Sequence, residues 1–186
     1  MRREGRRGTL EKTEKREVLT LAIFFWHEYE QNGYLSNWYE RPFEIDGFRY
    51  LHVEQYIMAQ KAKLFGDTER YTQILRATSP RECKALGKLV TPYEDEVWAY
   101  FRAEVLKKGL LAKFSQNGDL LQQLLSTEDE LLAEASPKDK IFGIGMDAAT
   151  AAKFSPNAWS GQNLLGKTLM DLRRMLRVCP RAYPYR

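Results

Sequence analysis

The sequence predicts a single α+β domain that is rich in helices and has a few short strands. Three observations support this fold class. The composition, with 44% hydrophobic and 29% charged residues in a chain of 186, is that of a globular protein with a substantial core. Several stretches repeat apolar residues at helical spacing. A hairpin signal, Asp46-Gly47, lies between alternating segments within residues 41–50.

The remaining elements follow in order along the chain. Residues 19–26 (LTLAIFFW) form a short apolar run, which predicts a buried strand before the hairpin. Asn117-Gly118 marks the end of a helical region. Residues 131–136 (LLAEAS) and 141–145 (IFGIG) predict short strands or extended loops. Helices are predicted at 52–65, from Pro80 onward behind the capping box 79–82 (SPRE), at 93–113, at 119–126 and at 163–176.

The net charge of +4 is concentrated at the two ends of the chain. Residues 1–20 hold seven Arg or Lys against four Glu, and residues 177–186 add three Arg, so the part between them is slightly acidic. We predict a basic, disordered tail over 1–18, the domain over 19–176 and a short basic C-terminal tail over 177–186. Basic tails can also hold a chain on nucleic acid, which remains an alternative role.

The sequence argues against several classes of protein. It contains no apolar stretch long enough to span a membrane, and its Arg-rich start lacks the hydrophobic region of a signal peptide. Two cysteines, Cys83 and Cys179, and two histidines, His27 and His52, are too few for a disulfide framework or a His/Cys metal centre. We expect a cytoplasmic or otherwise intracellular protein that needs no metal, cofactor or membrane. Mg²⁺ held by carboxylates is the one metal alternative left open.

The helix predicted at 52–65 carries two charged residues within its apolar face. At 100° per residue, Glu54 and Lys61 share a sector with Val53, Ile57, Met58, Leu64 and Phe65. Seven residues correspond to about 10.5 Å of helix rise, so these two charges cannot easily pair with each other. Burying an unpaired charge costs several kcal/mol. Either each residue has a structural partner elsewhere, or the helix borders a cleft that uses both, and geometry alone leaves these alternatives equal.

Two loops favour the cleft. Residues 33–39 (GYLSNWY) place Ser36 and Asn37 before the hairpin among aromatic neighbours. Residues 141–147 (IFGIGMD) place Gly143 and Gly145 around one residue, which lets a backbone approach a ligand closely. Each signal is weak by itself, because a Gly-x-Gly is usually a turn.

Two further positions add to this pattern. Gly161 and Asn163 stand at the start of the last predicted helix, where backbone N–H groups favour an anion or phosphate, although an Asn there is usually a cap. Trp98 is more often a core residue than a surface that stacks on a ligand. Together with the two helix charges, these segments favour a small-molecule cleft.

Four motifs in this order resemble NADAR (YbiA-like) domains. Residues 33–62 resemble the family's opening, with its aromatic-Ser-Asn-aromatic sequence, its Pro-Phe, a hairpin and a Glu-bearing helix. Residues 97–117 resemble its Trp-bearing helix with a Lys-Phe-x-Gln ending, and residues 131–145 its acidic strand followed by aromatic-Gly-x-Gly. Residues 161–176 resemble its final Gly-x-Asn-x-Leu-Gly helix. The similarity covers about 20–176.

The resemblance implies a metal-free hydrolase of N-glycosidic bonds in ribose derivatives. The activities it implies are removal of ADP-ribose from guanine and cleavage of phosphoribosylamino-pyrimidine intermediates of the riboflavin pathway. Three departures bear on the substrate more than on the chemistry. Many members have His where this chain has Gln55 and Trp where it has Phe142, and GIG (143–145) replaces a riboflavin-type GDG. By motif position the implied functional residues are Glu54, Lys61, Trp98, Glu134 and the loop 142–145.

These observations predict an N-glycosidase, and removal of ADP-ribose from modified guanine is the favoured reaction. Glu54 would stabilise positive charge at C1′ or activate water. Lys61 would capture the opened sugar as a Schiff base or bind phosphate. The base could be free or carried on DNA or RNA. The alternatives are the riboflavin-pathway hydrolase and a module that binds ADP-ribose or NAD without turnover. Substrate binding is assigned to Ser36, Asn37, Trp98, Glu134, Phe142, Gly143, Gly145 and Asn163.

Overall fold

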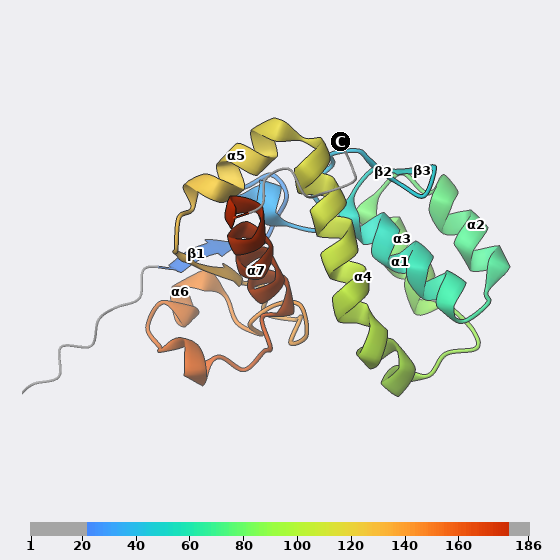
Figure 1. Cartoon of the computed structure of the whole chain (residues 1–186). Helices are drawn as coiled ribbons and strands as arrows, with labels where there is room; N and C mark the ends of the chain where they lie inside the picture. The colour runs from blue at the N-terminus through green and yellow to red at the C-terminus, as the bar shows by residue number, and fades with distance from the viewer. Residues whose placement is uncertain (1–21, 179–186) are drawn as a thin grey trace, which may run out of the picture.

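The computed structural model describes residues 22–178 and confirms a helix-rich α+β fold (Figure 1). Its strands are β1 (Ala22–Phe25), β2 (Phe43–Ile45), β3 (Phe48–Tyr50) and β4 (Leu131–Glu134). Its helices are α1 (Val53–Leu64), α2 (Thr68–Arg76), α3 (Pro80–Lys88), α4 (Asp95–Gln116), α5 (Gly118–Ser126), α6 (Ala148–Ala151) and α7 (Leu164–Val178), with two 3₁₀ turns, η1 (Gly33–Leu35) and η2 (Pro156–Ala158). The tail predicted over 1–18 lies outside the described residues. No helix within 22–178 is long and apolar enough to cross a membrane.

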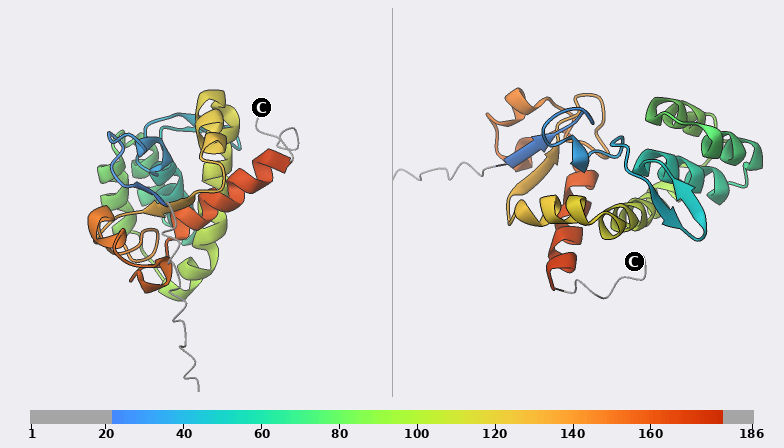
Figure 2. Two further views of the ribbon diagram at one scale, coloured as in Figure 1. Left: turned by 90° about the vertical axis from the view of Figure 1, so that its left-hand side faces the viewer. Right: turned by 90° about the horizontal axis from the view of Figure 1, so that it is seen from above.

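The longest helix, α4, lies between two groups of elements (Figures 1 and 2). On one side it packs against α1, which also contacts α2 and α3; on the other it packs against α7, which contacts β4. Leu106, Leu110 and Phe114 of α4 are fully buried in the main core. Because burial of apolar surface drives folding, this shared helix fixes α1 and β4 in one framework.

The strands form two separate pairs. β1 and β4 run parallel, with Phe25 opposite Glu134, so the first strand pairs with a segment from far along the chain. β2 and β3 form the predicted antiparallel hairpin. Asp46 and Gly47 both have positive φ, 53° and 80°, as a two-residue type I′ turn requires. The hairpin prediction is confirmed.

The elements that differ from the predicted ones are short or irregular. The sequence analysis did not predict α2, a nine-residue helix whose apolar face is formed by three residues, the buried Ile74 and the partly buried Tyr71 and Leu75. Of the two alternatives predicted for residues 141–145, a short strand or an extended loop, the structure has the loop. α7 continues two residues into the predicted C-terminal tail, where Arg177 contacts the Asp129 carboxylate and the Glu128 carbonyl.

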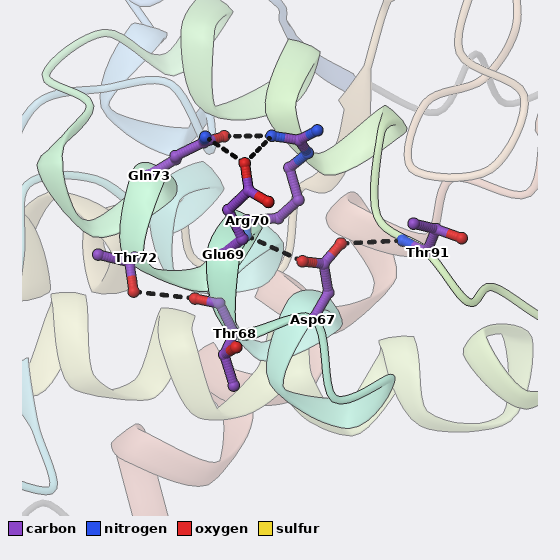
Figure 3. Close-up of polar contacts among 7 residues, drawn as sticks. All are labelled: Asp67, Thr68, Glu69, Arg70, Thr72, Gln73 and Thr91. Carbon is purple, nitrogen blue, oxygen red and sulfur yellow. Dashed lines mark hydrogen bonds and ion pairs between the residues drawn. The ribbon is translucent and has the colours of Figure 1, made fainter.

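Asp67 anchors both α2 and the segment that leads into α4. Its carboxylate accepts hydrogen bonds from the backbone N–H groups of Arg70, at 2.9 Å, and Thr91, at 3.0 Å (Figure 3). These backbone donors lower the pKa of Asp67. An Asp cap is a standard helix-start signal, and here it also connects two segments of the chain.

α1 is more completely buried than an amphipathic helix. Gln55 and Tyr56, which the helical projection puts opposite the apolar sector, are each only 2% exposed, whereas Leu64 is exposed. The reason is that α1 packs against α2, α3 and α4 on different sides. Gln55 Oε1 accepts from Leu51 N at 2.8 Å, and its Nε2 donates to the carbonyls of Ile74, at 3.1 Å, and Ala77, at 2.9 Å.

We expect Gln55→Ala to lower the free energy of unfolding by about 3 kcal/mol, because the substitution leaves four backbone groups without this partner and a cavity beside them. The measurement is the urea unfolding midpoint. Gln122→Ala, on the exposed face of α5, is the matched control and should leave the midpoint close to that of the parent. A Gln55→Ala midpoint equal to the control would contradict the proposed tie between α1 and α2.

Candidate active site

A buried lysine fixes the loop that covers the start of α1. Lys113 of α4 is fully buried and donates to the carbonyls of Tyr34, at 2.7 Å, and Ser36, at 3.0 Å. Burial, assisted by Arg41, lowers the pKa of Lys113 to about 7. The next carbonyl along, that of Asn37, accepts from Glu54 N at 3.0 Å. The loop predicted to bind substrate is thus positioned on the helix that carries Glu54.

Glu54 is a buried carboxyl with an unusual protonation equilibrium. It is 6% exposed, and its Oε1 has no hydrogen-bond partner among the described residues. Burial raises the pKa of Glu54 to about 7, while Lys84 and a hydrogen bond with the Trp38 side chain oppose the rise. A group with this pKa exists in both protonation states near neutral pH, which suits general acid–base chemistry.

Glu134 ends β4 and is held there through its backbone. Asn163, at the start of α7, accepts from Glu134 N through Oδ1 at 3.1 Å and donates to the Leu132 carbonyl through Nδ2 at 2.9 Å. On the other side, the Glu134 carbonyl accepts from Ile144 N at 2.9 Å. The oxygen and the nitrogen of the Asn163 side-chain amide are therefore both used to position β4.

The Glu134 side chain interacts electrostatically with Glu54. Its Oε2 is buried and has no hydrogen-bond partner in the described part of the chain. Burial raises the pKa of Glu134 to about 8, with smaller contributions that raise it from Asp139 and Glu54 and one that lowers it from Lys84. Glu54 is thus one of the charges that raise the pKa of Glu134.

Lys84 and Asp139 complete this group. The Lys84 amine of α3 lies 3.6 Å from Asp139 Oδ2 and 5.9 Å from the centre of the Trp38 ring. Asp139 is fixed because its Oδ1 accepts from the backbone N–H groups of Ile141, at 3.0 Å, and Phe142, at 2.8 Å. The Lys84 side chain is 42% exposed, so it links the two buried carboxyls to solvent. We call Glu54, Lys84, Glu134 and Asp139 the four-residue cluster.

Lys61, predicted to act with Glu54, lies in a different environment. Its amine donates to the Gly87 carbonyl at 2.8 Å, at the end of α3, and lies 4.0 Å from the centre of the Tyr93 ring. Burial lowers its pKa, and the charge that opposes this effect is that of Asp95. The structure thus gives Lys61 a partner elsewhere and does not bring it to Glu54. A cation at a helix C-terminus stabilises the helix.

The amine beside Glu54 is instead Lys84, which the sequence analysis did not select. Its helix was predicted from the capping box, but the sequence does not say which face of that helix packs on α1. Trp38 was also overlooked, although it lies in the quoted loop 33–39. Trp98, selected for ligand stacking, is 6% exposed and belongs to the main core. The aromatic ring beside the cluster is that of Trp38.

Gly143 in the 141–145 loop and Gly161 before α7 allow close contact between backbone segments. A Cβ on Gly143 would lie 2.9 Å from the Glu134 carbonyl and 2.8 Å from that of Asp139, and one on Gly161 would lie 2.4 Å from the Gly143 carbonyl. The loop carbonyls accept from the start of α7, so the donors predicted to bind an anion are used within the protein. These donors are the N–H groups of Gly161, Asn163, Leu164 and Leu165.

Three other residues are buried or partly buried within the protein: Phe142, which was predicted to bind substrate, and the reactive side chains Cys83 and His52. Phe142 is partly buried against the main core. Burial raises the pKa of the Cys83 thiol to about 12, and burial with the nearby Lys113 charge lowers that of His52 to about 4. Neither group changes protonation near neutral pH. Within 22–178, no three His, Cys, Asp or Glu side chains form a group that could hold a metal ion.

Comparison with known proteins places this geometry in a family. The model of the NADAR domain matches residues 24–177. N-glycosidase R617 of Acanthamoeba polyphaga mimivirus is 42% identical over 124 residues, which are 67% of this chain and 73% of that protein. Riboflavin biosynthesis protein VVA0006 of Vibrio vulnificus is 31% identical over 86% of this chain and 40% of its own length. The NMR structure of E. coli YbiA superposes with a TM-score of 0.72 at 28% identity, covering 88% of this chain and 89% of that one.

The raised pKa of Glu134 makes stability depend on pH with a definite sign. The folded protein holds this proton up to about pH 8, whereas an unperturbed Glu loses it near 4.5, so this residue's contribution to stability falls as pH rises through that interval. Glu134→Gln removes the titration. We expect the urea midpoints of parent and variant to agree at the acid end and the parent to fall below the variant above pH 8.

The control is Glu104→Gln, which removes one carboxyl from the surface of the protein. If the parent and Glu134→Gln curves stay parallel across the whole range, Glu134 does not titrate as its burial requires.

Proposed function

Because this chain belongs to the NADAR family, we propose that it hydrolyses the N-glycosidic bond between an ADP-ribosyl group and guanine. The chain is an enzyme of the class that its relatives represent, a hydrolase of N-glycosyl bonds. The choice of ADP-ribosyl guanine is our proposal. The observation that carries it is the four-residue cluster, in which two buried carboxyls with raised pKa values both interact electrostatically with the partly exposed Lys84.

The two carboxyls suit the two electrostatic needs of the reaction. As the C–N bond breaks, positive charge builds at C1′ and the departing base gains electrons. An ionised Glu54 would stabilise the charge at C1′, and a protonated Glu134 would donate its proton to the base. Glu134 has the higher pKa of the two, about 8 against about 7, so it is the carboxyl better suited to hold the proton.

Lys84 is the residue we assign to capture of the sugar. The Lys84 amine lies 3.6 Å from Asp139 Oδ2 and its side chain is 42% exposed, so water can carry away the proton that the attacking amine must lose. The amine adds to C1′ as the base leaves with the carboxyl proton, and the sugar ring opens to give a C=N bond to Lys84. Water then hydrolyses this bond, which releases the sugar aldehyde and returns the amine. The flat Trp38 ring near Lys84 offers a surface for the planar base.

One position favours this substrate over the riboflavin-type one. Where the riboflavin-type loop has an Asp between two glycines, this chain has Ile144, which is fully buried in a small apolar cluster with Ala133, Ala135 and Ala151. The loop therefore offers no carboxylate there. The alternative is cleavage of phosphoribosylamino-pyrimidines, and it is favoured by the name of the Vibrio relative.

Incubation with ADP-ribosyl guanosine and, separately, with a phosphoribosylamino-pyrimidine tests the proposal. We expect release of guanosine and no release of the pyrimidine. Glu54→Gln should lower kcat by at least about a hundredfold, because Gln keeps the shape but cannot ionise, while ADP-ribose still binds. Release of the pyrimidine alone would contradict the proposal and show that the enzyme catalyses the riboflavin-type reaction. Near-normal turnover by Glu54→Gln would remove its role.

A second experiment addresses the lysine. Borohydride added during turnover should reduce the C=N bond and leave the sugar on Lys84, detectable by peptide mass spectrometry. Lys84→Arg should lose nearly all activity, since guanidinium stays protonated and cannot add to C1′. Lys61→Arg is the matched control, because Lys61 binds a backbone carbonyl, and should stay active. An active Lys84→Arg variant without a trapped adduct would show that Lys84 only binds phosphate.

A further inference from the structure

Three aromatic rings stack on one another in the turn that follows β1. The ring centres of Trp26 and His27 are 3.9 Å apart with planes 28° apart, and those of His27 and Tyr29 are 5.0 Å apart with planes 9° apart. Tyr29 is the outer member and is 77% exposed, whereas Trp26 and His27 are partly buried. The stack therefore ends in an aromatic ring that is largely open to solvent.

The turn that carries these rings is fixed by short-range contacts. Glu30 Oε2 accepts from His27 N at 3.3 Å, and the Glu30 carbonyl accepts from Gly33 N at 2.8 Å. A Cβ on Gly33 would lie 2.3 Å from the Glu28 carbonyl, so the chain closes on itself here as only glycine allows. A ring surface that is ordered in advance loses little entropy when a ligand stacks on it.

The same turn connects to the four-residue cluster in both chain directions. Trp26 directly follows Phe25, the strand partner of Glu134. In the other direction the chain continues through η1 to Asn37, whose carbonyl accepts from Glu54 N. The stack thus lies on the segment that joins the two buried carboxyls, at the end of the β1–β4 pair where Glu134 stands.

We propose that the open face of Tyr29 binds a second base of the substrate by stacking, and this inference rests on the proposed function. A flat aromatic side chain stacks on purine and pyrimidine rings alike, because every base has a π-face. The carboxylates of Glu28 and Glu30 beside it disfavour a phosphate at this position. Two sources supply such a base: the adenine of the ADP-ribosyl group, or the neighbour of the modified guanine in a single-stranded nucleic acid.

Equilibrium binding measured by calorimetry tests the site without requiring turnover. The ligands are ADP-ribose and an unmodified single-stranded DNA oligonucleotide that contains guanine. Tyr29→Ala should weaken at least one of the two about tenfold, as loss of one base–aromatic stack does, and Tyr29→Phe should restore the parent affinity. Tyr100→Ala, which removes a tyrosine that is 79% exposed on α4, is the matched control and should bind like the parent.

The pattern of loss identifies the base. Weaker binding of ADP-ribose assigns adenine to Tyr29, and weaker binding of the oligonucleotide alone assigns a neighbouring base. The inference is overturned if Tyr29→Ala binds both ligands like Tyr100→Ala, if Tyr29→Phe is as weak as Tyr29→Ala, or if the parent binds neither ligand. Failure of the proposed function is separate, because it would appear as a parent protein that binds these ligands but releases no base from ADP-ribosyl guanosine.

Discussion

The burial of two carboxyls close to each other, Glu54 and Glu134, is the constraint on which the rest of the structure depends. Removing either ionised group from water is costly, and the charge of Glu54 adds to the cost for Glu134. The surroundings offset only part of this cost, through Lys84 and the Trp38 side chain. The pKa of each carboxyl therefore rises to about 7 or 8. Apolar residues at these two positions would make the protein more stable. The burial of two carboxyls despite this cost therefore indicates a catalytic role.

Much of the polar interior serves to hold these two carboxyls in place. Gln55 ties the start of α1 to α2, Asn163 ties β4 to α7, and Lys113 ties the loop over Glu54 to α4. Each of these buried side chains satisfies backbone groups of segments that have no regular partner there. The reactive groups, in contrast, include oxygens of Glu54 and Glu134 without partners in the described chain. Gln55, Asn163 and Lys113 thus use their polar atoms to hold the framework, and the two carboxyls keep oxygens available to substrate atoms.

Local pattern was enough to predict the hairpin, the helix of Glu54 and the β4 segment with Glu134, because periodicity, turn residues and caps are local signals. It was not enough to pair Glu54 with its amine. Lys61 lies on the same face of α1 as Glu54. However, α1 is surrounded by α2, α3 and α4, so residues on one face contact different neighbours along the helix. Lys84 reaches Glu54 only because α3 packs on α1, which depends on the whole fold. Asn163 was likewise selected because it precedes a helix. The local sequence does not show that its side chain binds the backbone of β4.

The most direct measurement of the central claim is a carbon NMR titration of the glutamate side-chain carboxyls, assigned with Glu54→Gln and Glu134→Gln, with and without saturating ADP-ribose. The account predicts that the pair titrates with apparent pKa values near 7 and 8 in the free protein, and that both shift when the ligand binds. Titration of both carboxyls near the ordinary value of 4.5, or values that ADP-ribose leaves unchanged, would contradict it.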